Sequence, residues 1–166
     1  MDATSRLALP LLMAGQVQKE IYHNEALALL DLMVGGVADG SEIAAPPANP
    51  TLGLCYLVAA SGASGLFAGH EDQIAGWTAG GWRFIPPVDG LRLQSRATGV
   101  DVVRWNGGWT SGSVRALEVR INGVKVLGSA GSAIADPAGG STVDANARAC
   151  LALVLAALRS HGLIAS

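Results

Sequence analysis

Glu20 and His23 form the first pair of side chains whose spacing suits chemistry. An E-x-x-H spacing places both on one face of a helix, where a carboxylate and an imidazole could bind one metal ion. A protein metal site needs at least a third ligand, and neither His70 nor His161 has a ligand-like neighbour at helical spacing. We therefore expect no metal site, and we expect His23 to lie on the surface or to help cap a helix.

The residues that an enzyme needs are not arranged in a recognisable pattern. The sequence has no G-x-S-x-G elbow and no strand-to-helix phosphate loop. Cys55 and Cys150 lie far apart without a C-x-x-C pair, so the sequence predicts two buried thiols and neither a disulfide nor a zinc site. Glu71 and Asp72 are the best candidates for a glycosidase pair, but adjacent acidic residues in a loop are usually solvated. We expect no catalytic residue, no cofactor and no enzymatic activity.

Four tryptophans flank two glycine-rich turns, which read Trp77-Thr-Ala-Gly-Gly-Trp82 and Trp105-Asn-Gly-Gly-Trp109 and resemble a weak internal repeat. The glycines supply the positive φ that a tight hairpin needs. An indole beside such a turn could stack on a sugar ring and donate its N–H to a hydroxyl group. Because the chain has only two Phe and two Tyr, the same indoles could instead form the core of a small sheet. All four are candidate sugar-binding residues, with a core role as the alternative.

Composition excludes several classes of partner. The chain has 166 residues, of which half are hydrophobic and 14% are charged, so it should fold as one medium domain or a small domain with terminal appendages. A net charge of -2 with scattered arginines provides no basic stripe, and we expect no nucleic-acid binding. The N-terminal apolar run is short and is broken by Pro10. We expect no signal peptide, no membrane insertion and synthesis in the cytoplasm.

The first 43 residues are expected to form an arm followed by a docking helix. The leucines around Pro10 have no apolar partner within the arm, so the arm should lie against its own domain or a neighbouring subunit. Asn24 is expected to cap the helix by accepting from backbone N–H groups at its first turn. The helix should end at Gly35 and Gly36.

Residues 44–115 are expected to form a Trp- and Gly-rich β module after a stiff Pro-rich linker at residues 44–50. Short β-prone stretches separated by Gly-rich turns predict a small antiparallel or barrel-like sheet. They cover residues 54–59, 73–78, 82–85, 91–95 and 100–105. In residues 116–140, Asn122-Gly123 between alternating β-formers predicts a further hairpin, which a Gly-rich loop follows.

Residues 141–166 are expected to form an oligomerising helix. Ser141 to Asp144 resembles a capping box, and Gly162 should end the helix. A four-three-four spacing, typical of bundled helices, relates Ala147, Leu151, Val154 and Leu158. So apolar a helix must be covered on most of its surface, either by other copies around a symmetry axis or by the sheet of its own chain. The predicted fold class is therefore α+β, mainly β.

A motif near the N-terminus carries a resemblance to a known family. Residues 14–20 read AGQVQKE and residues 23–27 read HNEAL. Further matching residues follow in the same order: Pro46-Pro47, Cys55-Tyr56, Gly69-His70, Trp77, Gly81-Trp82 and Phe84. Over about residues 7–110 the chain resembles a family of unknown function found in bacterial prophages and gene-transfer-agent clusters. No catalytic residue comes with this resemblance.

The resemblance implies a structural protein of a virion, near the tail tip or in a fibre or spike. Residues 142–148, 156–159 and 162–164 are also similar to the end segment of phage fibre and spike proteins, which are commonly trimers. A homo-oligomer is therefore expected, with a trimer favoured, together with other virion proteins as partners. A docking or self-packing motif is then the better interpretation of Gln16, Gln18, Lys19, Glu20, His23 and Asn24.

The sequence is compatible with two functions. The leading hypothesis is a phage or gene-transfer-agent-like particle component that contributes to attachment to the host cell surface, with a bacterial surface polysaccharide as its ligand. The alternative is an architectural baseplate, tail or head-decoration adaptor without a ligand of its own. A wall-degrading enzyme fits the particle context but not the residues, because the chain lacks a recognisable catalytic pair.

Overall fold

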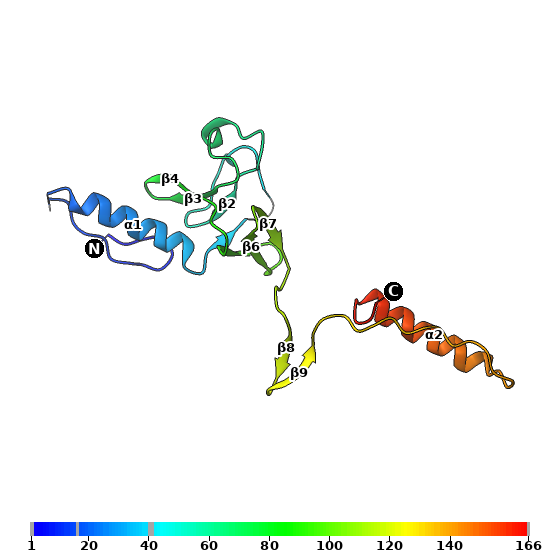
Figure 1. Ribbon diagram of the computed structural model, residues 1–166. Coiled ribbons are helices and arrows are strands. Elements are labelled where there is room, and N and C mark those ends of the chain that lie inside the picture. The colour runs from blue at the N-terminus through cyan, green and yellow to red at the C-terminus, as the bar shows by residue number, and fades with distance from the viewer. Residues whose placement is uncertain (1, 16, 40–41, 166) are drawn as a thin grey trace. The chain divides into compact units, whose positions relative to one another are not determined.

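The computed structural model describes residues 2–15, 17–39 and 42–165, and the chain divides into two compact units at Ser113 (Figure 1). The N-terminal unit contains one helix and a seven-stranded sheet, and the C-terminal unit contains a two-stranded sheet and one helix. This arrangement confirms the predicted α+β, mainly β fold class. No helix in the described parts of the chain is long and apolar enough to cross a membrane.

Helix α1 (Lys19–Met33) begins earlier than predicted, so Asn24 lies inside it and is not its cap. The Asn24 side chain instead accepts from the backbone N–H of Leu12 at 2.9 Å and donates to the carbonyl of Leu12 at 3.0 Å. A carboxamide carries both a donor and an acceptor, so it can satisfy both backbone groups of one residue in an extended arm. The helix ends before Gly35, which has a φ of 59°, as the glycine pair predicts.

The sheet of the N-terminal unit is mixed, with the strand order β4-β3-β2-β1-β5-β6-β7. Its strands are β1 (Val37–Ala38), β2 (Cys55–Leu57), β3 (Ile74–Thr78), β4 (Gly81–Ile85), β5 (Arg92–Ser95), β6 (Asp101–Trp105) and β7 (Gly108–Ser111). The predicted antiparallel pairs are present, but β1 runs parallel to both of its neighbours. Two antiparallel meanders, β2-β3-β4 and β5-β6-β7, therefore flank one short central strand.

Alternation along the strands divides the core between the two faces of the sheet. On β2 and its ends, Cys55 and Leu57 join one cluster, whereas Tyr56 and Val58 join the other. The first cluster also contains Leu32 of α1, which fits closely because Gly76 opposite has no side chain: a Cβ there would lie 2.3 Å from Leu32 Cδ1. The residues of the first cluster are Leu32, Ala38, Cys55, Leu57, Ile74, Leu93 and Val102. Those of the second are Leu54, Tyr56, Val58, Phe67 and Ala75.

The C-terminal unit holds the hairpin of β8 (Val119–Ile121) and β9 (Val124–Leu127), followed by helix α2 (Ala145–Ser160). The predicted Asn-Gly turn is confirmed, since Asn122 and Gly123 have φ angles of 50° and 79°. The capping-box prediction is wrong in detail: Asp144 is itself the N-cap and accepts from Ala147 N–H at 2.9 Å. Its short side chain reaches the N3 amide directly, so a serine three residues earlier is not needed.

One face of α2 packs against a segment of its own unit. Gly131 and Ile164 form a parallel bridge, and Arg159 lies 3.1 Å from Asp136 and also donates to the Ile134 carbonyl. Arg148, one turn from the helix start, donates to a backbone carbonyl of the same segment. The two arginines of α2 are therefore directed toward their own chain.

Candidate functional sites

The four tryptophans flank two hairpins that occupy equivalent positions in the two meanders. Trp77 and Trp82 pair across β3 and β4, and their ring centroids lie 4.9 Å apart. Trp82 also makes edge contacts with Tyr56 and Phe67, at centroid distances of 5.5 and 5.1 Å. Trp82 is thus partly buried and packs against the second core cluster, and Trp77 is half-buried beside it.

Trp109 connects the two meanders. Its indole N–H donates to the Asp72 carbonyl at 3.3 Å, and the Arg104 guanidinium lies 5.6 Å from its ring centroid. Arg104 is 6% exposed and forms an ion pair with the Asp72 carboxylate at 2.5 Å. Because a buried arginine is tolerated only when it is paired, this cluster holds β6 and β7 against the loop before β3.

Trp105 differs from the other three because it is 49% exposed. It directly precedes the Asn106-Gly107 turn, whose two N–H groups donate to the Asp89 carboxylate at 2.8 and 3.4 Å. The turn is thereby held rigidly beside the indole. Of the four predicted sugar-binding residues, Trp105 is therefore the one whose ring is best placed to meet a ligand.

The predicted docking motif separates into two sets. Asn24 holds the arm through Leu12, and Glu20 accepts from the Gly15 N–H at 3.3 Å. The remaining described members, Gln18, Lys19 and His23, are exposed. Gln16 lies outside the described residues.

Asp31 joins the arm to α1, a role that its sequence context does not indicate. Asp31 is 2% exposed, and its carboxylate accepts from Thr4 Oγ1 at 2.7 Å, Arg6 N–H at 3.0 Å and Leu7 N–H at 2.7 Å. Burial alone would raise the pKa of Asp31, but the bonds from Leu7, Thr4 and Arg6 and the Arg6 charge more than offset it. The pKa of Asp31 therefore lies below its ordinary value.

Arg6 completes the junction at the other end of the same turn. Its guanidinium donates to the carbonyls of Asp31 at 2.5 Å, Leu32 at 3.3 Å and Val34 at 3.2 Å. These carbonyls lie at the C-terminal end of α1, where they have no partner within the helix and attract positive charge. The arm therefore lies against its own domain, folded back along α1 (Figure 1).

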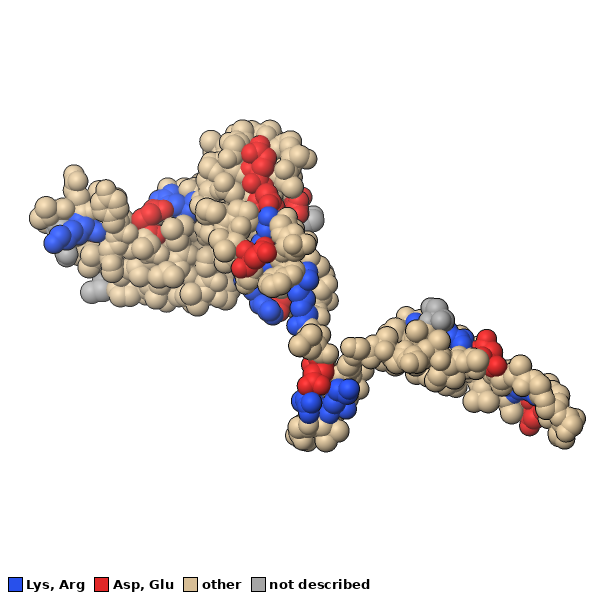
Figure 2. Space-filling view, in the orientation of Figure 1, with Lys and Arg blue, Asp and Glu red and all other residues tan. Residues whose placement is uncertain are grey.

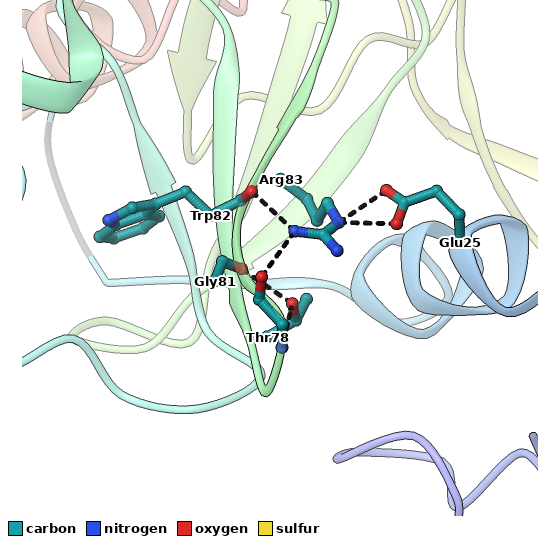
Figure 3. A network of polar contacts seen from close by, with 6 residues as sticks. Glu25, Thr78, Gly81, Trp82 and Arg83 are labelled. Atoms are coloured by element: carbon teal, nitrogen blue, oxygen red, sulfur yellow. Dashed lines mark hydrogen bonds and ion pairs between the residues drawn. The ribbon is translucent and has the colours of Figure 1, made fainter. Parts of the chain in front are cut away.

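An ion pair connects α1 to the β3-β4 hairpin (Figure 3). Nε of Arg83 lies 2.6 Å from one Glu25 oxygen and 2.8 Å from the other, and Nη1 donates to the carbonyls of Gly80 and Trp82. A cavity of about 420 Å³ opens between the arm, α1 and this hairpin. Its wall includes the Glu25–Arg83 ion pair and Asp31, whose carboxylate accepts hydrogen bonds from the arm, so these charged groups are already engaged within the unit.

The two cysteines have different environments. Cys55 is fully buried, and burial raises the pKa of its thiol to about 12. Cys150 is exposed on α2, so the prediction of two buried thiols is wrong for this residue. The helix buries only the side that faces residues 131–139, and Cys150 projects elsewhere. Among the described residues, no three His, Cys, Asp or Glu side chains gather in a way that could hold a metal ion.

The predicted oligomerisation seam of α2, which consists of Ala147, Leu151, Val154 and Leu158, is largely exposed to solvent. Leu151 and Val154 are 52% and 49% exposed, Ala147 is exposed, and Leu158 is half-buried. Leu155 follows Val154 in the sequence but is not part of the seam. Among the described residues of α2, it is the one that is buried. On the face shown in Figure 2, most of the helix surface is correspondingly uncharged.

One comparison with known proteins identifies a family. The model of a protein family of unknown function, DUF2793, matches residues 23–110, from α1 to the last strand of the large sheet. The match shows a family of unknown function over both meanders, but it carries no link to prophages or gene transfer agents, and residues 7–22 of the expected range lie outside it. No curated protein matches the chain significantly. Since the matched segment covers more than half of the sequence, the chain belongs to the DUF2793 family.

Proposed function

We propose that this chain is a non-enzymatic structural component of a phage or gene-transfer-agent-like particle, located in a tail fibre, tail tip or spike. In this proposal it contributes to attachment of the particle to the host cell surface. The N-terminal unit is the presenting module, and helix α2 joins the subunits into a homo-oligomer, with a trimer favoured. The protein is made in the bacterial cytoplasm and becomes part of the virion.

The apolar outer face of α2 is the observation that carries the proposal. Arg148 and Arg159 are directed toward residues 131–139, whereas Leu151, Leu153 and Val154 remain 49–74% exposed. A helix of a self-sufficient domain shows the reverse arrangement, with charge outward and leucine inward. The four-three-four spacing along this face fits packing against parallel copies of the same helix.

Trp105 supports the attachment role. Its half-exposed ring sits at the end of a hairpin whose turn is fixed by Asp89, so little conformational freedom would be lost on binding. The flat apolar face of an indole suits the C–H face of a sugar ring. A bacterial surface polysaccharide is therefore the ligand class that we propose.

Trp82 and Trp109 favour the alternative, an architectural adaptor without a ligand. Both indoles are engaged in packing and hydrogen bonding inside the N-terminal unit. A module whose tryptophans serve mainly its own stability can act as a spacer in a baseplate, tail or head decoration. The two proposals differ in the role of Trp105 and agree on oligomerisation.

Light scattering of the purified full chain, beside a chain that ends at Gly140, tests the shared part of the proposal. A full-length trimer that becomes a monomer on truncation supports a particle component assembled through α2. A full-length monomer at micromolar concentration would contradict it. To separate the two roles, particles carrying Trp105→Ala are compared with wild-type particles: lost adsorption with intact assembly favours attachment, and unchanged adsorption favours the adaptor.

A further inference from the structure

The β8-β9 hairpin has one charged face and one apolar face. Arg120 and Lys125 pair across the strands, and Arg120 Nε lies 2.5 Å from the Glu118 carboxylate. Ile121 and Val124 pair on the opposite face, and Val119 pairs with Leu127 beyond a bulge. The hairpin is therefore amphipathic in the way of a strand pair that covers a core.

Nothing in the described part of the C-terminal unit covers the apolar face of this hairpin. Ile121 and Val124 are 59% and 67% exposed, and Leu127 is 50% exposed. An isolated two-stranded hairpin is marginally stable in water, and it gains independent stability when its apolar face packs against another layer. The face therefore needs an occupant.

We propose that the apolar face of β8-β9 packs against the same hairpin of other copies of this chain, so that the hairpin forms a second part of the subunit interface. This inference rests on the proposed oligomer and extends it beyond α2. The charged side chains Glu118, Arg120 and Lys125 would then lie on the outside of the assembly. Charged and apolar side chains are already separated between the two faces in this way.

The amount of exposed apolar surface argues for a stable association between copies. Among residues 114–165, thirteen large apolar side chains are at least 39% exposed. If full exposure of one such side chain corresponds to roughly 60–120 Å², together they present on the order of 500–900 Å². A standard interface buries about 800 Å² on each partner, so the hairpin can supply only part of one, and the other exposed side chains of the unit, including those of α2, must supply the rest.

The chemistry of the face argues for a second copy as its occupant. A partner with complementary charge has nothing to bind there, because the charged groups of the hairpin point to the other side. An uncharged aliphatic face is complementary to itself, and identical copies around a symmetry axis bring identical faces together without burying an ion.

Cysteine crosslinking of the full chain tests this inference. Ile121→Cys is placed in a Cys150→Ser background and treated with a short bismaleimide, and Lys125→Cys on the charged face is the matched control. Cys55 is buried with a raised thiol pKa, so it stays silent in both variants. We expect about tenfold more product linked between chains at position 121, because the interface holds those thiols at a high effective concentration.

The outcomes separate this inference from the proposed function. If the chain is an oligomer and position 121 crosslinks no better than position 125, the hairpin is not part of the interface, and oligomerisation through α2 stands. A chain that is a monomer by light scattering would overturn both.

Discussion

Asp31→Asn should release the N-terminal arm and destabilise the N-terminal unit. The carboxylate accepts three hydrogen bonds in a site that is 2% exposed, and two of them come from the backbone N–H groups of Arg6 and Leu7. An asparagine keeps one acceptor oxygen and turns an NH₂ group toward donors. A hydrogen bond to a charged group contributes about 1.5–3 kcal/mol, and a buried unpaired donor costs about 1–3 kcal/mol. We therefore expect a loss of about 3 kcal/mol in unfolding free energy.

Urea unfolding followed by tryptophan fluorescence measures this loss in the full chain, since all four tryptophans lie in the N-terminal unit. A destabilisation of about 3 kcal/mol lowers the urea midpoint by about 2 M for a unit of this size. Asp101→Asn is the control. Asp101 forms an ion pair with Arg92 at 2.7 Å, and the side chains of Asp101 and Arg92 are 45% and 65% exposed. Removing this pair should therefore change the free energy of unfolding by less than about 0.5 kcal/mol.

The dependence of the Asp31→Asn effect on pH provides a second check. The pKa of Asp31 is lowered in the folded chain, so its stabilising contribution is fully present above its ordinary pKa of 3.8 and disappears as pH falls through the folded value. The difference between wild type and variant should therefore be large at pH 7 and shrink below pH 3.8. An unchanged urea midpoint at pH 7, or a difference that grows in acid, would refute the role assigned to Asp31.

Three further predictions concern the other sites. Val154→Asp places a carboxylate in the proposed helix seam and should raise the dissociation constant of the oligomer by at least about a hundredfold, seen as a monomer by light scattering. In the native chain Cys150 should react with a disulfide reagent within minutes, whereas Cys55 should react only on unfolding; fast labelling of both would contradict the burial. Trp82→Ala should lower the free energy of unfolding, measured with urea, by about 3–5 kcal/mol, whereas Trp105→Ala should lower it by less than about 1 kcal/mol. Equal losses would show that Trp82 does not contribute more to the core than Trp105 does.

The helix variant needs a control that adds the same charge elsewhere. Ala156→Asp serves this purpose, because position 156 is exposed and lies on the side of α2 opposite Val154. It should leave the mass of the oligomer unchanged. If both substitutions dissociate the oligomer, the charge acts on the helix as a whole and the seam is not the interface.

Elements with local causes could be predicted from the sequence. The Asn122-Gly123 turn, the Trp105-Asn-Gly-Gly hairpin and the end of α2 near Gly162 each depend on backbone conformations that a few adjacent residues decide. Strand β1 could not be predicted, because its two residues are defined by parallel pairing with segments far along the chain.

The site residues divide in the same way. Asn24 has the sequence context of a helix cap, and only the arm that folds back from Leu12 gives its carboxamide another partner. Asp31 looks like an ordinary helical aspartate, since its partners Thr4, Arg6 and Leu7 lie more than twenty residues earlier. Long-range hydrogen bonds leave no periodic pattern in a sequence, so composition and spacing cannot reveal them.

The contrast between the two units connects folding to assembly. The N-terminal unit buries two apolar clusters and pairs Asp31, Arg104 and Glu25 within itself, so it is equipped to fold alone. Residues 114–165 leave thirteen large apolar side chains exposed, and covering a half-exposed aliphatic side chain contributes about 1 kcal/mol. Covering all of them would contribute on the order of 10 kcal/mol per copy before the entropy cost of association is subtracted, which is the scale of the net stability of a typical domain. Folding of this unit and assembly of the subunits are therefore expected to be one coupled process, with an apparent stability that rises with protein concentration.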